Sequence, residues 1–505
     1  MTWWPDFDLP RFTLGEIVIP FVALFALCGF GVMTYDPDYQ RWWALALIAV
    51  MVAAMFHVKL VIPNSVLWAL GFFAYAALSL IWSADARSGY DDLIGLAVIV
   101  ILFIGSRQVN LEPYMWVVPT AGIIACGLLW YLPARYGGFG NDTFIAEFFL
   151  IAGAFCLKGR ARQICLVIIL ATLVFAVESN ARRVVAIVAI AYGCYWLWCR
   201  GWKYAAFFLP VAGLNVVFLV GLADPGVIMS STLSRAEIQI NTALMILDAP
   251  LLGWGAGSFE AVYPRYQEMH MKLIPGMGTI MSTGTMFVNS AHNEYLQVFA
   301  EYGIVGVILA GGFLWSIRKS VIWPPVVTIA ALSVVGFPLE NPSTAALALL
   351  AIRQQPSKRC LAFPMKWPAL AVSITLLWLT TLSLISESYM SGVRNAMSSN
   401  PLGALSANLK AYELWPYGRG PRMQLPLTMT AILRNTPHRV TPESADNIHR
   451  ISKTAGPESP GILLARLEYL VNARRNRDEA NEIMHTMYRY TPRQLRIALG
   501  NMVEK

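Results

Sequence analysis

The polar residues that could carry out chemistry lie in three clusters, each beside an apolar segment of the chain. Arginine makes permanently charged, bidentate contacts with anions, and histidine exchanges protons near neutral pH. An ionisable residue at membrane depth is a functional candidate by default. A histidine grouped with acidic residues at a helix entrance likewise favours function over simple packing. The candidates are Arg182 and Arg183 in the first cluster, Arg235 in the second, and His292, Glu294 and Glu301 in the third.

A glycine-rich segment that follows Arg235 has a different interpretation. Residues 248–259 contain Gly253, Gly255 and Gly257, but they lack the preceding strand and the spacing of a nucleotide-binding loop. The glycines predict a turn in which the backbone approaches a partner closely. The six histidines show no spacing typical of metal ligands. We therefore expect no metal and no other cofactor.

The composition places these clusters in a membrane protein. Of the 505 residues, 57% are hydrophobic and 13% are charged, and a soluble domain carries ~25% charged residues. Mean hydropathy is +0.54. Runs of apolar residues typical of membrane helices recur about 12 or 13 times, depending on whether the short run 343–352 crosses fully. The sequence thus predicts an all-α polytopic membrane protein with a soluble helical domain at the C-terminal end.

Polar intervals divide the chain into four regions. Residues 1–223 are expected to hold transmembrane helices 1–9, residues 224–291 to form an outer-face loop with an interfacial helix, and residues 292–386 to hold the C-terminal transmembrane helices. The remaining 387–505 form a soluble helical tail, in which 26 of 119 residues are charged. The helices are expected near 17–35, 42–57, 66–82, 92–106, 114–132, 143–157, 164–178, 183–199, 204–223, 293–316, 321–337, 343–352 and 367–386.

Lysine and arginine set the expected orientation, because basic loops stay in the cytoplasm. Alternate loops are basic, whereas the loops between them, such as 83–85 and 136–142, are acidic or neutral. The N-terminus is therefore expected in the cytoplasm and the 224–291 loop on the outer face. The tail is also outside if 343–352 crosses. The basic loops contain Lys59; Arg107; Lys158, Arg160 and Arg162; Arg200 and Lys203; Arg318 and Lys319; and Arg353, Lys358, Arg359 and Lys366.

Two segments of the tail have the apolar spacing of helices. The first runs over 461–472 and the second over 478–490, where two acidic residues open the segment and Pro492 follows its end. A pair of this kind predicts a small helical hairpin. The apolar positions are Ile462, Leu463, Leu467 and Leu470 in the first segment and Ala480, Ile483 and Met487 in the second.

Four motifs follow one another in a fixed order along residues 234–306. They are Ser234-Arg235, Asp248-x-Pro250-Leu251-Leu252-Gly253-x-Gly255, His292-Asn293-x-x-Leu296 and Glu301-x-Gly303-x-x-Gly306. In this order, with a long outer loop before the histidine, they resemble the signature of the O-antigen ligase and polymerase superfamily. Ser179-x-x-Arg182 is similar to the first arginine motif of that superfamily, and Arg183 follows directly, so either arginine could be the functional one. The resemblance covers roughly residues 140–342.

The resemblance implies a metal-independent, inverting glycosyltransferase of the bacterial inner membrane, with its active site at the periplasmic face. Such enzymes transfer a glycan from an undecaprenyl-diphosphate carrier to an acceptor hydroxyl. Arg235, with Arg182 or Arg183, would bind the diphosphate, because arginine forms bidentate contacts with phosphate. His292 would take the proton of the acceptor hydroxyl, and Glu294 or Glu301 would orient this histidine.

The acceptor and two other classes of function stay open at this stage. The acceptor could be lipid A–core, a growing polysaccharide or a protein hydroxyl, the last as in a protein O-oligosaccharyltransferase of the same superfamily. A transporter of lipid-linked glycan would be expected to show inverted repeats and broken helices at the midplane. A scaffold that recruits other proteins through the tail would not need His292. Neither nucleic acid nor a soluble cofactor is an expected partner; the membrane lipid is.

Overall fold

The structure is a computed structural model, and it describes most of the body and parts of the tail. The described residues are 38–54, 60–61, 63–106, 116–131, 142–156, 228–266, 290–334, 336–352, 360–361, 366–418 and 477–490, with isolated positions elsewhere. The body elements are α2 (Asp38–Ala54), β1 (Leu60–Val61), α3 (Asn64–Ser79), α4 (Ala86–Ser106), α5 (Val117–Tyr131), α6 (Asp142–Phe155), α14 (Glu294–Ile317), α15 (Trp323–Leu332), α16 (Pro342–Leu350), β2 (Cys360–Leu361) and α17 (Lys366–Ser399). The loop and tail elements are α10 (Ile228–Asp248), α11 (Phe259–Val262), η3 (Tyr263–Arg265), α18 (Pro401–Leu414) and α22 (Arg477–Tyr490).

The described part of the chain confirms an all-α membrane protein. Three of its helices are long and apolar enough to cross a membrane, namely α4, α14 and the Lys366–Val393 part of α17, and several shorter apolar helices accompany them. The predicted helices at 66–82, 92–106, 143–157 and 293–316 correspond to α3, α4, α6 and α14. The expected helices at 164–178, 183–199 and 204–223 lie outside the described residues, so the total of 12 or 13 stays a prediction.

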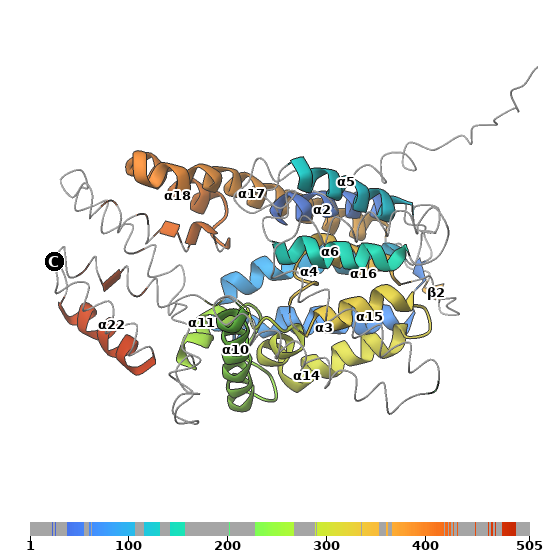
Figure 1. Ribbon diagram of the computed structural model, residues 1–505, viewed down its shortest axis with the longest axis horizontal. Helices are drawn as coiled ribbons and strands as arrows, with labels where there is room; N and C mark the ends of the chain where they lie inside the picture. Colours follow the sequence, from blue (N-terminus) through green and yellow to red (C-terminus); the bar gives the residue numbers. More distant parts are fainter. Residues whose placement is uncertain are drawn as a thin grey trace, which may run out of the picture.

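The body has two distinguishable ends, and the strands mark one of them (Figure 1). There β1 pairs with β2 in an antiparallel ladder of two residues each, and Val321 pairs with Ile352 in an isolated bridge. These pairs bring together the chain next to Lys59, Lys319 and Arg353, all from loops expected in the cytoplasm. We call this the basic end.

The opposite end, the site end, holds the acidic turn 83–85, α10 and the start of α14 (Figure 1). α16 begins next to the start of α14, since Leu339 donates a hydrogen bond to Glu294, and it ends at the basic end, where the Ile322 N–H donates to the Ala351 carbonyl at 2.8 Å. The short segment 343–352 therefore runs from the start of α14 to the basic end, and the side of the membrane on which the tail lies stays a prediction.

α17 is longer than the sequence indicated. A span ending near residue 386 was expected, but the helix continues to Ser399, and its 34 residues extend roughly 50 Å, more than the ~30 Å of a bilayer core. It therefore projects beyond the membrane body at the site end. After Asn400, whose side chain caps α18 by accepting from the Gly403 N–H at 3.1 Å, α18 folds back against α17 (Figure 1).

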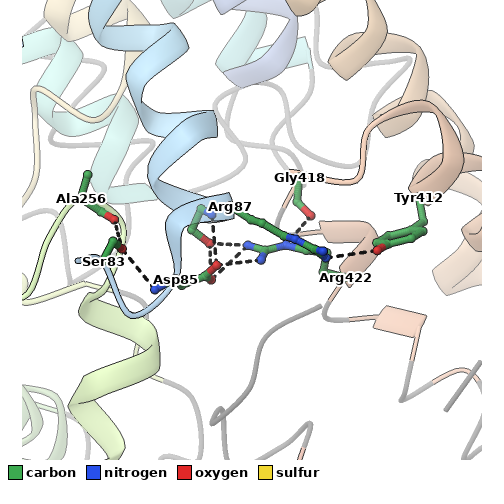
Figure 2. Close-up of polar contacts among 8 residues, drawn as sticks. Ser83, Asp85, Arg87, Ala256, Tyr412, Gly418 and Arg422 are labelled. Carbon is green, nitrogen blue, oxygen red and sulfur yellow. Dashed lines mark hydrogen bonds and ion pairs between the residues drawn. The ribbon is translucent and has the colours of Figure 1, made fainter. Parts of the chain in front are cut away.

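A partly buried ion pair attaches the start of the tail to the acidic turn. Arg422, which is 3% exposed, donates to both carboxylate oxygens of Asp85 at 3.0 and 3.2 Å and also to the Ser88 hydroxyl. Figure 2 shows this guanidinium pointing into the 83–88 turn from the tail. Burial opposes ionisation of Asp85, but Arg422 and the hydrogen bonds from Ser88 outweigh it and hold the pKa of Asp85 below its usual value. Nearby, the Trp415 indole donates to Asp91 at 2.9 Å.

The structure describes the second of the two tail segments as a helix, and the hairpin as a whole stays a prediction. α22 covers the second segment, and an ion pair of 3.0 Å between Arg466 and Glu479 joins the two segments. α22 also packs against η3, in the outer loop. All the predicted apolar positions that are described are buried: Leu463, Leu467, Leu470, Ala480, Ile483 and Met487.

Candidate functional site

His292 lies immediately before α14, in a backbone conformation that few residues adopt. Its φ is 49°, the one positive value among the described non-glycine residues, and histidine is one of the residues that tolerate this region. Asn293 follows as the N-cap of α14, with its side chain accepting from the Leu296 N–H at 3.1 Å. The His292–Asn293 motif thus ends the outer loop, begins the helix and places the imidazole at the site end of the body.

Glu294, in the first turn of α14, clamps the connection between α15 and α16. One of its carboxylate oxygens accepts from the Ser333 hydroxyl at 2.5 Å, and the other accepts from the Leu339 N–H. Its own N–H donates to the Ser333 carbonyl at 2.9 Å. Because these bonds occupy both of its oxygens, the contacts of Glu294 in the structure are those of a residue that positions a loop.

The clamped connection carries an aromatic side chain to His292. We call residues 336–340 the Phe337 loop. The ring centroids of Phe337 and His292 are 5.4 Å apart, and on α6 the ring of Phe144 meets Phe337 edge to face at 5.2 Å. Phe337 therefore lies in contact with both the candidate base and the membrane body. Sequence reasoning assigned no site residue to this segment.

Arg235 lies in the third turn of α10 and acts on His292 through its charge. Burial, and then the positive charge of Arg235, lower the pKa of His292 to about 4. At neutral pH the imidazole is therefore uncharged and able to accept a proton. Within the described residues, the structure thus places three of the predicted site residues, Arg235, His292 and Glu294, around one point at the site end.

Glu147, on α6, is a neighbour of this group that sequence reasoning missed. It is 1% exposed, and its two carboxylate oxygens have no hydrogen-bond partner among the residues that the structure describes. It interacts electrostatically with Glu294 and Arg235 and approaches Gly336 so closely that a Cβ there would lie 2.2 Å from its Oε1 atom. A signal existed in the sequence, because an acidic residue in a predicted membrane helix is a functional candidate.

The glycine-rich segment 250–255 forms backbone hydrogen bonds with α14 at a break in that helix. We call this contact the joint. Gly303 interrupts α14 with φ 59° and ψ −164°. In an unbroken helix Ile304 and Val305 would donate to Ala300 and Glu301. Here those two N–H groups donate to the Pro250 and Leu251 carbonyls instead, at 2.9 and 3.4 Å, and the Ala300 and Glu301 carbonyls accept from the Trp254 and Gly255 N–H groups at 2.9 and 2.8 Å.

The glycines of the joint are required by close backbone contacts. A Cβ on Gly253 would lie 2.3 Å from the Glu301 carbonyl oxygen, and a Cβ on Gly303 would lie 2.3 Å from the Leu251 carbonyl oxygen. Both residues also have positive φ. The prediction of a turn that lets the backbone approach a partner is confirmed, and two of the motifs found in the sequence prove to be the two halves of one joint.

Glu301 lies next to this joint. It is buried, and its side chain accepts a hydrogen bond of 3.4 Å from the Phe259 N–H at the start of α11. This contact ties α14 to the outer loop. The role in orienting the base that was expected for Glu301 stays a prediction. Arg182 and Arg183 lie outside the described residues, so the choice between them stays open as well.

Comparison with known proteins agrees with the class that this architecture defines, a polytopic α-helical membrane protein with a polar site at one end of its helices. Residues 165–311 match the family model described as O-Antigen ligase. The match confirms the resemblance to the O-antigen ligase and polymerase superfamily and includes Arg235, His292, Glu294 and the joint. No curated protein matches the chain.

Proposed function

We propose that this membrane protein is a glycosyltransferase that moves a glycan from an undecaprenyl-diphosphate carrier to an acceptor hydroxyl at the periplasmic face of the bacterial inner membrane. The observation that carries the proposal is the pairing of a cation with a proton acceptor. Arg235 lies close enough to lower the pKa of His292, in the segment that matches the O-Antigen ligase model. A diphosphate bound at Arg235 would thus lie next to the base that the transfer needs.

In the proposed reaction, His292 accepts the proton of the acceptor hydroxyl as the oxygen attacks the anomeric carbon of the donor. The new glycosidic C–O bond forms on the face opposite the leaving group, which inverts the anomeric centre. The bond between the anomeric carbon and the phosphate oxygen breaks, and its electrons leave with the undecaprenyl diphosphate. Arg235, with Arg182 or Arg183, balances the negative charge of that leaving group through charge-assisted contacts.

Substitution of the two described residues tests the proposal. Arg235→Ala is expected to lower kcat/KM by about tenfold or more, since hydrogen bonds to charged groups contribute about 1.5–3 kcal/mol. Arg235→Lys recovers part of the loss, because a point charge lacks the guanidinium fork. His292→Ala lowers the rate by about 10²–10⁴-fold. Retention of glycan transfer by both alanine variants, each inserted and expressed normally, would refute the proposal and favour a transporter or scaffold.

The identity of the acceptor follows from the same assay. Purified protein with a lipid-linked glycan donor is offered lipid A–core, a glycan repeat unit or a Ser/Thr peptide in separate reactions. Transfer to the peptide alone would identify a protein O-oligosaccharyltransferase, and transfer to the glycan alone a polymerase. We favour the polymerase and protein-glycosylating branches, since a tail of 119 residues follows the membrane body.

A further inference from the structure

We propose that the Phe337 loop, clamped by Glu294, positions the imidazole of His292, and that Phe337 is a positioning residue for proton transfer. The inference rests on the proposed role of His292 as the base. It also changes the role expected for Glu294, which then acts on His292 through the loop and not by a direct contact.

The backbone at His292 gives the first reason. His292 precedes the helix and has a left-handed φ of 49°, so the hydrogen bonds of α14 do not fix its side chain. A base needs a fixed direction, because a displacement of ~1 Å can cost ~10²-fold in rate. The contact that the structure provides is the Phe337 ring, tilted by 44° to the imidazole.

The support behind Phe337 gives the second reason. Phe144 meets the ring from α6 with an interplanar angle of 82°, an edge-to-face geometry that aromatic pairs favour. The main chain of the loop is held as well. Glu294 binds Ser333 before the loop and Leu339 within it, and the Thr344 hydroxyl donates to the Pro338 carbonyl. Glu294 is only two residues from His292, so the clamp and the base begin the same helix.

The loop also accounts for the surroundings of the base. Burial is the largest cause of the low pKa of His292, and Phe337 supplies apolar contact to the imidazole. Removal of the ring is therefore expected to have two linked effects. The imidazole becomes more mobile, which lowers kcat. It also becomes more exposed to solvent, which raises its pKa toward the ordinary value of ~6.5.

Phe337→Leu tests the inference on the full-length protein in detergent. The rate at which His292 reacts with an acylating reagent specific for neutral imidazole, followed by mass spectrometry across pH, gives its pKa without substrate. We expect that pKa to rise from about 4 in the variant, and kcat to fall about 10- to 100-fold with a smaller change in the KM for the donor. Phe337→Tyr keeps the ring and restores both values.

Two further variants separate positioning from general loss of structure. Phe103→Leu removes a ring from another buried edge-to-face pair, with Phe313 at 5.2 Å, and should leave the titration of His292 unchanged. Glu294→Gln, which replaces one acceptor oxygen with a donor, should shift that titration in the same direction as Phe337→Leu. If neither Phe337→Leu nor Glu294→Gln moves it, the inference is wrong. If the titration moves but His292→Ala still transfers glycan, positioning stands and the proposed function fails.

Discussion

At the scale of single residues, the unusual property of this site is that the proposed base has a pKa well below the pH at which it would work. Burial and Arg235 hold the pKa of His292 at about 4, whereas a general base works best near the ambient pH. A bound diphosphate would offset the charge of Arg235. The pKa of His292 would then rise, and the imidazole would become a stronger base when the donor is present.

This coupling predicts two different pH profiles. The kcat/KM profile reports the free enzyme, so its acid limb should lie near pH 4, whereas the limb for kcat, which reports the donor complex, should lie at higher pH. In Arg235→Ala the limb for kcat/KM should move up, because one cause of the lowered pKa is gone, but burial keeps it below the ordinary ~6.5. Initial rates between pH 4 and 8 give both limbs. Identical limbs for wild type and Arg235→Ala would exclude the coupling.

Metal independence is a second prediction at the residue scale. Because arginines supply the positive charge for the diphosphate in the proposed mechanism, turnover of purified protein should persist in excess chelator. Turnover is measured with and without chelator, and the Arg235→Ala variant serves as the low-activity reference. Loss of turnover that Mg²⁺ or Mn²⁺ restores would contradict the role given to the arginines.

At the scale of elements, the membrane helices could be predicted and their junctions could not. Apolar runs place α3, α4, α6 and α14 close to their observed bounds, because burial in lipid demands a continuous apolar segment. α17 exceeded its predicted end, since helical structure continues where hydropathy falls. The joint between 250–255 and α14 depends on backbone groups of two distant segments. The glycines indicated a close contact, but no pattern identified its partner.

The joint predicts opposite effects for two glycine substitutions in one helix. Gly303→Ala should destabilise the protein by at least about 1–2 kcal/mol, the cost of a left-handed conformation, and the added Cβ would also meet the Leu251 carbonyl. Gly311→Ala, also in α14, has open space around its Cβ and should stabilise by about 0.5–1 kcal/mol. Thermal unfolding in detergent measures both. Equal stability of the two variants would show that position 303 does not require glycine.

At the scale of the whole molecule, the start of the tail and the candidate site lie at the same end of the body. Arg422 reaches Asp85 at the site end, and α22 packs on η3 of the outer loop. Sequence reasoning left the side of the tail conditional on one short helix, because the two charges are 337 residues apart and neither carries a motif. Phe337 and Glu147 are similar cases, because the importance of each depends on neighbours from other helices.

The contacts between the tail and the site end predict the behaviour of fusion reporters. A reporter that is active only in the cytoplasm should be silent when fused near Met277 or near Leu425 and active near Ser357, in the basic loop before β2. Matched expression of the three fusions is checked by immunoblot. Activity near Leu425 with silence near Met277 would mean that the tail contacts are wrong, and activity near Met277 would invert the body.

The ion pair that holds the tail predicts a large effect of one arginine. Arg422→Ala leaves the partly buried Asp85 carboxylate without this guanidinium. Loss of one partner from a buried pair costs about 3–5 kcal/mol, an upper bound here because Asp85 is 12% exposed. Arg87→Ala is the control, since Arg87 donates to the neutral Tyr412 hydroxyl at 3.2 Å and its loss should cost about 0.5–1.5 kcal/mol. Proteolysis of the tail under native conditions compares the two. The pair weakens at acidic pH, as Asp85 becomes protonated below the usual carboxyl range.

The broken helix α14 restricts how a substrate can reach the base. Four backbone hydrogen bonds join 250–255 to the two sides of the Gly303 break. If this part of the loop swung away, as the lids of many enzymes do, those peptide groups would face apolar surroundings without partners, at a cost of several kcal/mol. Segment 250–255 is therefore expected to stay in place and not to open as a lid. In the proposed reaction, the donor and the acceptor would therefore enter and leave past other parts of the molecule.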